Sequence, residues 1–454
     1  MNPSVIRQTV VPSTLPATRE LYQGLLRAPG EYRALAARFL DLQLQRQAAG
    51  ESALPDDPQR WPDWLECSAR RTATAYAEYL RERRAGAARR HFRNRAQALY
   101  FLQAVQPTKA VDGAWLLGLL QHWDDPRALP LLQICLEELG HGNPARNHVL
   151  IYRRLLGNLG CDSPLPLSDD HFLQGTLQLA FACLADDFLP ELLGYNLGYE
   201  TPPLHLLITS FELQELGIDP HYFRLHVTID NASSGHGRKA LQALRGYLPR
   251  LGDRAEFLQR VQAGFALNDL GLSCRQILDG FDLQAELLAM LERKRPFARQ
   301  MHADRSRIGG RSVNQWLAGS DSLEPFLQVL EREGWVIRNA DPARSRLWRL
   351  VSGDPAPMFG VFTPYERQLL YDWIAQDWSA PPAPRRSNPA ASASSAPAGL
   401  DFVAEERALL DRLGGLSAPE RMAALIAQMA PHRHWTPAGL LATRLYAGHL
   451  GIQA

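Results

Sequence analysis

The feature that most constrains the fold is an apolar periodicity that runs through residues 15–295. The segments 17–47, 71–105 and 171–200 carry apolar residues at spacings of three and four, which is the period of an amphipathic helix. Alternating strand patterns are nearly absent from this region, and short runs rich in Pro, Gly and Asp separate the periodic segments. The pattern predicts an all-α fold, with a bundle of about seven to nine helices.

Changes in pattern and composition divide the chain into five parts. The stretch after the helical region becomes mixed, and a low-complexity run of Pro, Ala and Ser follows it, from which no core can be built. The parts are an N-terminal helical region (1–90), the main bundle (91–295), a small module (296–378), a flexible linker (379–399) and a C-terminal helical segment (400–454).

The small module 296–378 reads as two helices followed by two short strands on either side of the turn "NADPARS" (339–345). This order resembles a winged helix, an α+β cap beside the all-α bundle. Its arginines could line a phosphate backbone, which makes nucleic-acid binding through residues 310–350 an alternative function. The formal net charge of +1 favours instead a cap packed on the bundle with solvated arginines. These are Arg338, Arg344, Arg346 and Arg349.

Several classes of protein are disfavoured by bulk features. No run of about 18 apolar residues is present, so no membrane span and no membrane partner are expected. The N-terminal residues have no apolar stretch typical of a secretory signal. The five cysteines are scattered and never form CxxC, which argues against a disulfide framework or a cysteine-bound zinc. We therefore expect a cytoplasmic protein.

Carboxylates and histidines gather in four segments of the helical region, and this combination is typical of a metal centre. In helical bundles such centres are built by acidic and imidazole side chains that project inward from facing helices. Oxygen and imidazole ligands suit iron or manganese better than they suit zinc or clusters. The candidates are Asp112; Glu137, Glu138, His141 and His148; Glu191 and Glu200; and His226, Asp230 and His236.

The last segment, "HVTIDNASSGH" (226–236), can be tested against helix geometry. His226 and Asp230 are four residues apart, so they lie about 40° apart on one helical face. His236 misses that face unless the helix is bulged or broken near Gly235, as happens at functional sites. The alternative is that Asp230 caps a helix and that His236 is a solvated first-turn residue.

The middle segments leave two choices open. Glu138 and His148 do not share a face of a straight helix, whereas Glu137, His141 and His148 do. The stretch "GHGNP" (140–144), however, is expected to interrupt the helix, because a residue before proline avoids the helical region. Glu191 and Glu200 compete for one role, since Glu191 also suits the start of a helix without any metal.

Taken in order, four pieces resemble one family. "VDGAWL" (111–116), "EELGHGNPARNH" (137–148), "LPELLGYNLGYE" (189–200) and "HVTIDNASSGHGRKA" (226–240) are similar to the iron-containing redox enzymes of the heme-oxygenase-like diiron oxygenase superfamily. The resemblance covers roughly residues 90–245. It implies a heme-oxygenase-like helical bundle that binds two Fe²⁺ and no heme. The metal ligands it implies are Asp112, Glu138, His148, Glu200 (or Glu191), His226, Asp230 and His236, with no catalytic residue beyond them.

The resemblance also implies a reaction class. Dioxygen would be the co-substrate, an external electron donor a further partner, and the outcome N-oxygenation, desaturation or oxidative cleavage of a small amino-acid-like metabolite, as in natural-product biosynthesis. Asn147 and Asn231 are candidates to bind the outer nitrogens of the ligand histidines. One iron instead of two stays open at this point, and so does a metal-free helical scaffold that serves a partner protein.

Overall fold

The computed structural model describes residues 15–47, 53–201, 203–229, 235–298, 300–319, 322–353, 356–358, 360–379 and 402–452. Helices make up most of these residues, and the strands among them form one small hairpin. The all-α fold class predicted from the apolar periodicity is confirmed. None of the helices in the described part of the chain is long and apolar enough to cross a bilayer.

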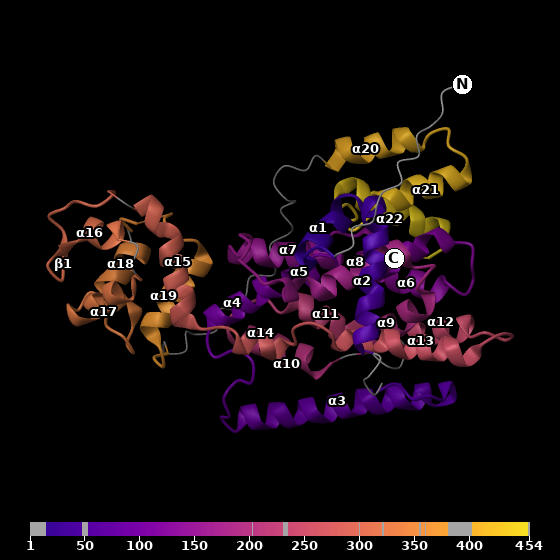
Figure 1. The fold of residues 1–454 in the computed structure, drawn as a ribbon, viewed down its shortest axis with the longest axis horizontal. Coiled ribbons are helices and arrows are strands. Elements are labelled where there is room, and N and C mark those ends of the chain that lie inside the picture. Colours follow the sequence, from indigo (N-terminus) through magenta and orange to yellow (C-terminus); the bar gives the residue numbers. More distant parts are fainter. Residues whose placement is uncertain are drawn as a thin grey trace.

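The chain forms α-helices (α), 3₁₀ helices (η) and two short strands (β) (Figure 1). They are α1 (Thr18–Arg27), α2 (Pro29–Gln47), η1 (Pro58–Arg60), α3 (Trp61–Arg84), α4 (Arg95–Ala104), α5 (Gln106–Lys109), η2 (Ala114–His122), α6 (Leu129–Glu138), η3 (Gly140–Gly142), α7 (His148–Leu159), η4 (Asp169–Phe172), α8 (Leu173–Leu184), α9 (Leu189–Tyr199), α10 (Leu204–Glu215), α11 (His221–Ile229), α12 (His236–Tyr247), α13 (Arg254–Ala266), η5 (Leu267–Asp269), α14 (Cys274–Asp279), α15 (Leu283–Ala298), β1 (Arg307–Ile308), β2 (Arg311–Ser312), α16 (Val313–Ala318), α17 (Glu324–Arg332), η6 (Pro342–Arg344), α18 (Arg346–Ser352), α19 (Pro364–Ala375), α20 (Phe402–Leu413), α21 (Ala418–Gln428) and α22 (Pro437–His449).

The bundle region contains more helices than the about seven to nine expected from periodicity. Breakers split long periodic stretches into separate helices that keep their apolar faces toward a common core. The expected interruption at "GHGNP" separates α6 from α7. The last candidate segment is likewise divided, because α11 ends at Ile229 and α12 begins at His236. These breaks lie beside the candidate ligands, so they decide which side chains meet.

Two glycines bring α9 and α13 into very close contact. A Cβ on Gly194 would lie 1.8 Å from the carbonyl oxygen of Val261, and one on Gly264 would lie 1.9 Å from that of Glu191. Only glycine permits such an approach of two helix backbones. The contact fixes α9, whose C-terminal cap is the candidate ligand Glu200.

The strands of the small module lie elsewhere than predicted. Residues 335–350 contain η6 and α18 instead of two strands, because the Asp341 side chain accepts from the Ala343 amide and starts a helical turn. The hairpin is β1–β2, and its turn is formed by Gly309 and Gly310, both at positive φ. A Gly-Gly pair between two strands is a known hairpin signal.

Three of the four arginines named in the sequence analysis, Arg338, Arg346 and Arg349, contact other residues of the module. Arg338 stacks on Trp373 at 4.5 Å from the ring centroid, and Arg346 stacks on Trp335 at 3.9 Å. Arg349 donates to the carbonyls of Ala343 and Arg344. Stacking on tryptophan rings and hydrogen bonds to carbonyl oxygens hold these guanidinium groups against the surface of the module.

The module and the bundle share apolar contacts. One cluster of buried side chains extends from α4 and α7 to α15, α17 and α19. The Asp372 side chain on α19 accepts from the Ala96 amide in the first turn of α4 at 2.6 Å. Because α7 begins with the candidate ligand His148, this contact surface also supports the candidate metal centre. Figure 1 shows α15–α19 together at one end of the molecule, beside α4.

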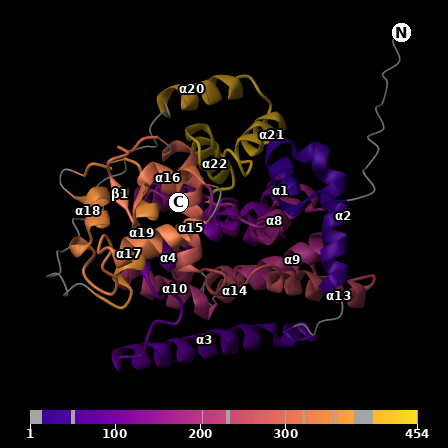
Figure 2. The ribbon, with the colours of Figure 1, turned by 60° about the vertical axis from the view of Figure 1, so that its left-hand side comes forward.

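The C-terminal helices α20–α22 belong to the core of the bundle. Leu409, Met422 and Tyr446 are buried in the same apolar cluster as α1, α6 and α8. The Tyr446 hydroxyl donates to the Leu120 carbonyl at 2.7 Å. In Figures 1 and 2 these helices lie on the opposite side of the bundle from α3. The predicted linker, 379–399, lies outside the described residues except for its first position.

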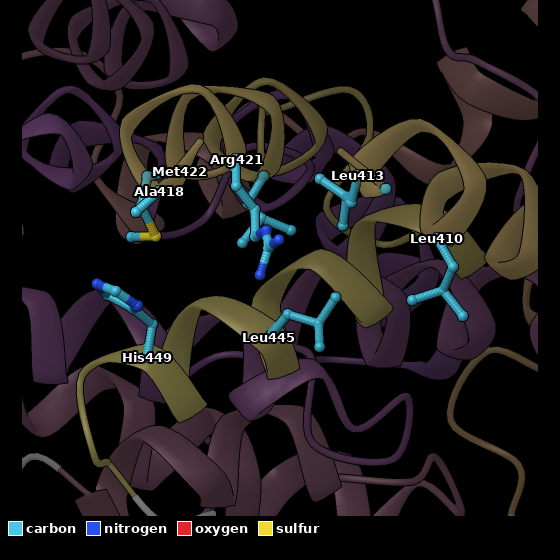
Figure 3. Close-up of a pocket in the computed structure, with 9 residues that line it drawn as sticks. Leu410, Leu413, Ala418, Arg421, Met422, Leu445 and His449 are labelled. Atoms are coloured by element: carbon cyan, nitrogen blue, oxygen red, sulfur yellow. The ribbon is translucent and has the colours of Figure 1, made fainter. Parts of the chain in front are cut away.

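An apolar groove of about 470 Å³ runs between α20, α21 and α22. Figure 3 shows Leu410, Leu413 and Leu445 on its walls, with Arg421 and His449 beside them. None of its lining residues is a candidate metal ligand. The groove is therefore separate from the site described below.

Candidate metal centre

Buried acidic and imidazole side chains form two adjacent groups in the described part of the bundle. The first, called the Asp112 group, consists of Asp112, Glu138, His148 and His226. The second, the Glu200 group, consists of Glu138, Glu200 and His236. Within each group one potential ligand atom per residue lies within 4.8 Å of all the others, and every member is buried. Glu138 belongs to both groups.

Asp112 reaches the centre from the short connection between α5 and η2. Gly113 follows it at φ +79° and turns the chain. A Cβ on Gly113 would lie 2.7 Å from the Cβ of Glu138. The bare backbone at this position therefore lets the two carboxylates approach each other.

Besides the imidazoles, three polar groups lie next to the Asp112 carboxylate. The hydroxyl of Tyr222 donates to Oδ2, and that of Tyr199 donates to Oδ1 at 3.3 Å. The Nζ atom of Lys109 lies 3.9 Å from Oδ1. Burial alone would raise the pKa of the Asp112 carboxyl, but the charge of Lys109 and the facing imidazoles hold it well below its usual range. Asp112 is therefore an anion and fixed in orientation.

His226 faces Asp112 from α11. Its Nδ1 lies 2.9 Å from the Tyr222 carbonyl oxygen one turn earlier, so this nitrogen carries the proton and donates. The Nε2 atom lies 3.0 Å from Asp112 Oδ2 and points into the Asp112 group. A backbone carbonyl that holds one ring nitrogen while the other faces a metal is a common arrangement in metal sites.

Glu138 and His148 meet because the chain reverses between them. Glu138 ends α6, and the next residues Gly140, His141 and Gly142 all have positive φ. The Asn147 side chain then accepts from the Leu150 amide and caps α7, which begins with His148. Two side chains that a straight helix would separate are thus placed at one point.

Glu138 and His148 form a close ion pair, but the two facing atoms are not aligned for a hydrogen bond. Glu138 Oε2 lies 2.6 Å from His148 Nδ1. Among the residues that the structure describes, neither atom has a hydrogen-bond partner, although both are buried. Buried polar atoms in proteins nearly always have partners. Two such atoms that face each other indicate a shared ligand, and a cation fits between an oxygen and an imidazole nitrogen.

The Glu200 group forms where α9 ends and α12 begins. His236 is fully buried at the first position of α12, and its Nδ1 lies 2.8 Å from Glu200 Oε2. The same nitrogen lies 3.5 Å from Glu138 Oε1. The interpretation of His236 as a solvated first-turn residue is therefore wrong. The extended backbone of Gly235, the N-cap of α12, lets this helix begin at His236 and places the side chain at the centre.

The two oxygens of Glu138 face different groups. Oε2 faces His148 in the Asp112 group, and Oε1 faces His236 in the Glu200 group. A carboxylate can bind two cations with its two oxygens, as in other bundles with two metals. The donor set is carboxylate and imidazole, and no cysteine joins either group in the described ranges. This set fits iron or manganese.

For the two open choices among the candidates, the structure shows which side chains lie together. Glu191 does not reach either group, because Arg260 binds both of its oxygens at 2.6 and 2.8 Å. His141 belongs to neither group, and Glu137 lies on the far side of His236. Six candidates come together: Asp112, Glu138, His148, Glu200, His226 and His236. Asp230, the seventh, lies outside the described residues, as does Asn231.

The sequence offered Glu137 as an alternative ligand, and the structure gives this residue a different contact. Its Oε2 lies 2.7 Å from His236 Nε2, and its other oxygen is paired with Lys239. Burial would raise the pKa of Glu137, but His236 and Lys239 lower it to about 2. This carboxylate holds the outer nitrogen of His236, the role that carboxylates have beside metal-bound histidines. Its position next to Glu138 in sequence gave no indication of a contact with α12.

Tyr222 and Tyr199 were missed for a different reason. Tyr222 lies one helical turn before His226, and Tyr199 directly precedes Glu200. Their positions beside candidate ligands were a signal in the sequence. A buried tyrosine in an apolar helix, however, is usually a core residue. Burial raises the pKa of both hydroxyls well above the usual value, so both remain hydrogen-bond donors.

Comparison with known proteins places this region in a family. Residues 99–269 match the model of a family described as iron-containing redox enzymes. The match includes all six side chains that come together, while the small module and α20–α22 lie beyond it. No curated protein and no solved structure matches the chain.

Proposed function

Residues 99–269 belong to the iron-containing redox enzymes, and from this premise we propose that the chain is a non-heme diiron oxidase or oxygenase. It uses dioxygen to oxidise a small organic substrate that resembles an amino acid. The reaction is an N-oxygenation, a desaturation or an oxidative cleavage. An external donor supplies the remaining electrons.

The observation that carries the proposal of two irons is the shared position of Glu138. The Asp112 group would hold one iron and the Glu200 group the other, and Glu138 would contribute a ligand atom to each, because it belongs to both groups. Each group alone offers three or four ligand atoms, which leaves coordination positions for a substrate or dioxygen. Asp230, which the family resemblance adds to the ligand set, is assigned to the same centre.

When bound, two ferrous ions supply the electrons and the open coordination positions with which dioxygen is activated. The protein contributes a dry and rigid site. The six described ligands are at most 5% exposed, so water is excluded from the reacting groups. The Tyr222 carbonyl fixes the tautomer of His226, and Glu137 fixes the ring of His236.

The other functions considered find less support. The stacked arginines of the small module are held by Trp335 and Trp373, which leaves little basis for a phosphate-binding surface there. A metal-free scaffold does not account for the buried atoms of Glu138 and His148 that lack partners among the described residues.

The test is iron loading without oxygen, followed by exposure to oxygen. We expect about two Fe²⁺ per chain by elemental analysis and rapid oxygen consumption in the presence of a substrate from a screen of amino acids. Iron that stays well below one equivalent per chain contradicts the proposal. Manganese loading under the same conditions serves as a control for the choice of metal.

A further inference from the structure

The segment between the ligands Glu138 and His148 needs support from outside. It consists of residues 139–147, and three consecutive residues within it, Gly140, His141 and Gly142, have positive φ. A non-glycine residue such as His141 in this conformation costs on the order of 1 kcal/mol or more. Such a segment keeps one shape only when its surroundings determine that shape.

The C-terminal helix α22 provides one part of this support. The guanidinium group of Arg444 donates to the carbonyl oxygen of Gly142 at 2.9 Å. The carbonyl oxygen of Leu440 lies 2.2 Å from the place that a Cβ on Gly142 would occupy. The backbone of the segment is thus pressed directly against a helix that lies some 300 residues further along the chain.

The second part is a buried histidine in the turn before α22. His434 is 1% exposed, and its Nδ1 lies 3.1 Å from the amide nitrogen of Asn147, 287 positions away in the sequence. An amide nitrogen can only donate, so His434 Nδ1 accepts and its proton is on Nε2. Burial lowers the pKa of His434 to about 3, so this neutral acceptor form is present throughout the neutral pH range.

Asn147 connects this histidine to both ends of the segment. Its Nδ2 also donates to the Leu139 carbonyl at 3.2 Å, directly after Glu138. Its Oδ1 accepts from the Leu150 amide at 3.0 Å and starts the helix of His148. Each polar atom of the Asn147 side chain is therefore engaged, and the orientation of the amide depends on the acceptor that His434 presents.

We propose that His434 is a positioning residue of the metal centre, which orients Asn147 and through it holds Glu138 and His148 at a fixed separation. The inference rests on the proposed metal site and concerns a residue, His434, that lies outside the family match. The C-terminal helices are thereby part of the metal-binding unit. Without the acceptor at position 434, Glu138 and His148 are still present, but their side chains are no longer held at a fixed separation.

The experiment is a Co²⁺ titration of the full chain under nitrogen, followed by the visible absorption of the bound ion. His434→Leu removes the acceptor and fills most of the space, and His434→Asn restores an acceptor close to the backbone. We expect binding by His434→Leu to be about tenfold weaker, the lower end of the effect of removing a residue that holds a metal ligand, because His434 acts through Asn147. His434→Asn should bind nearly as well as the wild type.

The matched control is His432→Leu, a neighbouring exposed histidine, which should leave Co²⁺ binding unchanged. Thermal unfolding without metal shows whether each variant folds. If His434→Leu does not fold, Arg444→Met removes the contact to Gly142 instead, and we expect a several-fold loss of affinity. Wild-type affinity and spectrum in a folded His434→Leu or Arg444→Met variant overturns the inference. A wild-type protein that binds no Co²⁺ overturns the proposed metal site itself.

Discussion

Two buried glutamates near helix ends differ in what surrounds them. Glu212 on α10 accepts from the Tyr79 hydroxyl at 2.7 Å and from the amides of Arg90, His91 and Phe92 at 2.6 to 3.0 Å. Glu138 at the end of α6 faces imidazoles, and its Oε2 has no hydrogen-bond partner among the described residues. Both side chains are at most 2% exposed.

The difference separates a carboxylate that the protein itself satisfies from one that we propose to bind metal. Glu212 is satisfied by four donors of the protein, and it fixes the turn before α4 without any further group. Glu138 is stabilised only by nearby positive charge: burial would raise its pKa, and His148 lowers it. An unsatisfied anion at such a depth is costly unless it is paired or binds a metal. Burial alone therefore does not identify a ligand, whereas missing donors do.

The largest effect should come from Glu138→Ala. Because Glu138 belongs to both groups, the change removes one ligand from each site. A four-ligand structural zinc site is worth about 10–16 kcal/mol, so one ligand contributes roughly 3–4 kcal/mol. We expect the loss of both metals at micromolar concentration, measured by Co²⁺ titration and elemental analysis. Retention of one full equivalent with wild-type affinity would show that Glu138 does not bridge.

Glu212→Ala removes the other glutamate of the comparison, the one that the protein itself satisfies. It leaves the amides of Arg90, His91 and Phe92 and the Tyr79 hydroxyl without an acceptor, and a buried unsatisfied donor costs about 1–3 kcal/mol. We expect the free energy of unfolding to fall by about 3 kcal/mol, measured with urea. Metal stoichiometry should stay at the wild-type value. A stable variant that has lost its metal would reverse the roles of the two glutamates.

The pH dependence of metal binding comes next in size. Burial would lower the pKa of His148, but Glu138 and Asp112 raise it to about 10 in the metal-free protein, from 6.5. Its protonated form stabilises the metal-free fold fully below pH 6.5, and this contribution is lost as the pH rises toward 10. A metal binds only the neutral imidazole, so binding releases this proton.

The affinity should therefore increase as much as about tenfold per pH unit between pH 6.5 and 8. Co²⁺ titrations at several pH values measure the slope, and calorimetry in two buffers of different ionisation enthalpy counts the released protons. An affinity that does not change over this range, with no proton released, contradicts the charge state assigned to His148.

The smallest effect is expected for Glu191→Gln, the candidate that the structure places away from the centre. Its partner Arg260 is 36% exposed and can be solvated after the change. Glutamine keeps an oxygen that can accept from Arg260, so the change weakens a charged hydrogen bond instead of removing it, and stability should fall by about 1 kcal/mol. Metal content by elemental analysis should not change. A loss of metal would restore Glu191 as a ligand.

Much of the centre could be predicted from sequence because the ligands lie near helix ends. The breaks that bring His148 and His236 inward were visible as "GHGNP" and as the glycine before His236. The choice between Glu191 and Glu200 could not be made, since it depends on Arg260, which is 69 positions away. The contact of Glu137 with His236 spans 99 positions and has no local signal.

The fold was predictable to a similar degree. Apolar periodicity gave the helical class, and the local sequence from Ser417 to Glu420 forms the capping box that starts α21. The strands were predicted around the "NADPARS" turn, where Asp341 and Ser345 start helical turns instead, while the Gly-Gly hairpin at 309–310 was overlooked. The packing of α22 on the segment 139–147 could not be foreseen, because the apolar residues of a helix do not identify the distant segment against which they pack.

The most direct test of the central claim is a crystal of the iron-loaded protein, measured at the iron absorption edge. The account predicts two anomalous peaks, one on each side of the Glu138 carboxylate, one near Asp112, His148 and His226 and the other near Glu200 and His236. A single peak, or peaks that do not contact Glu138, would contradict it.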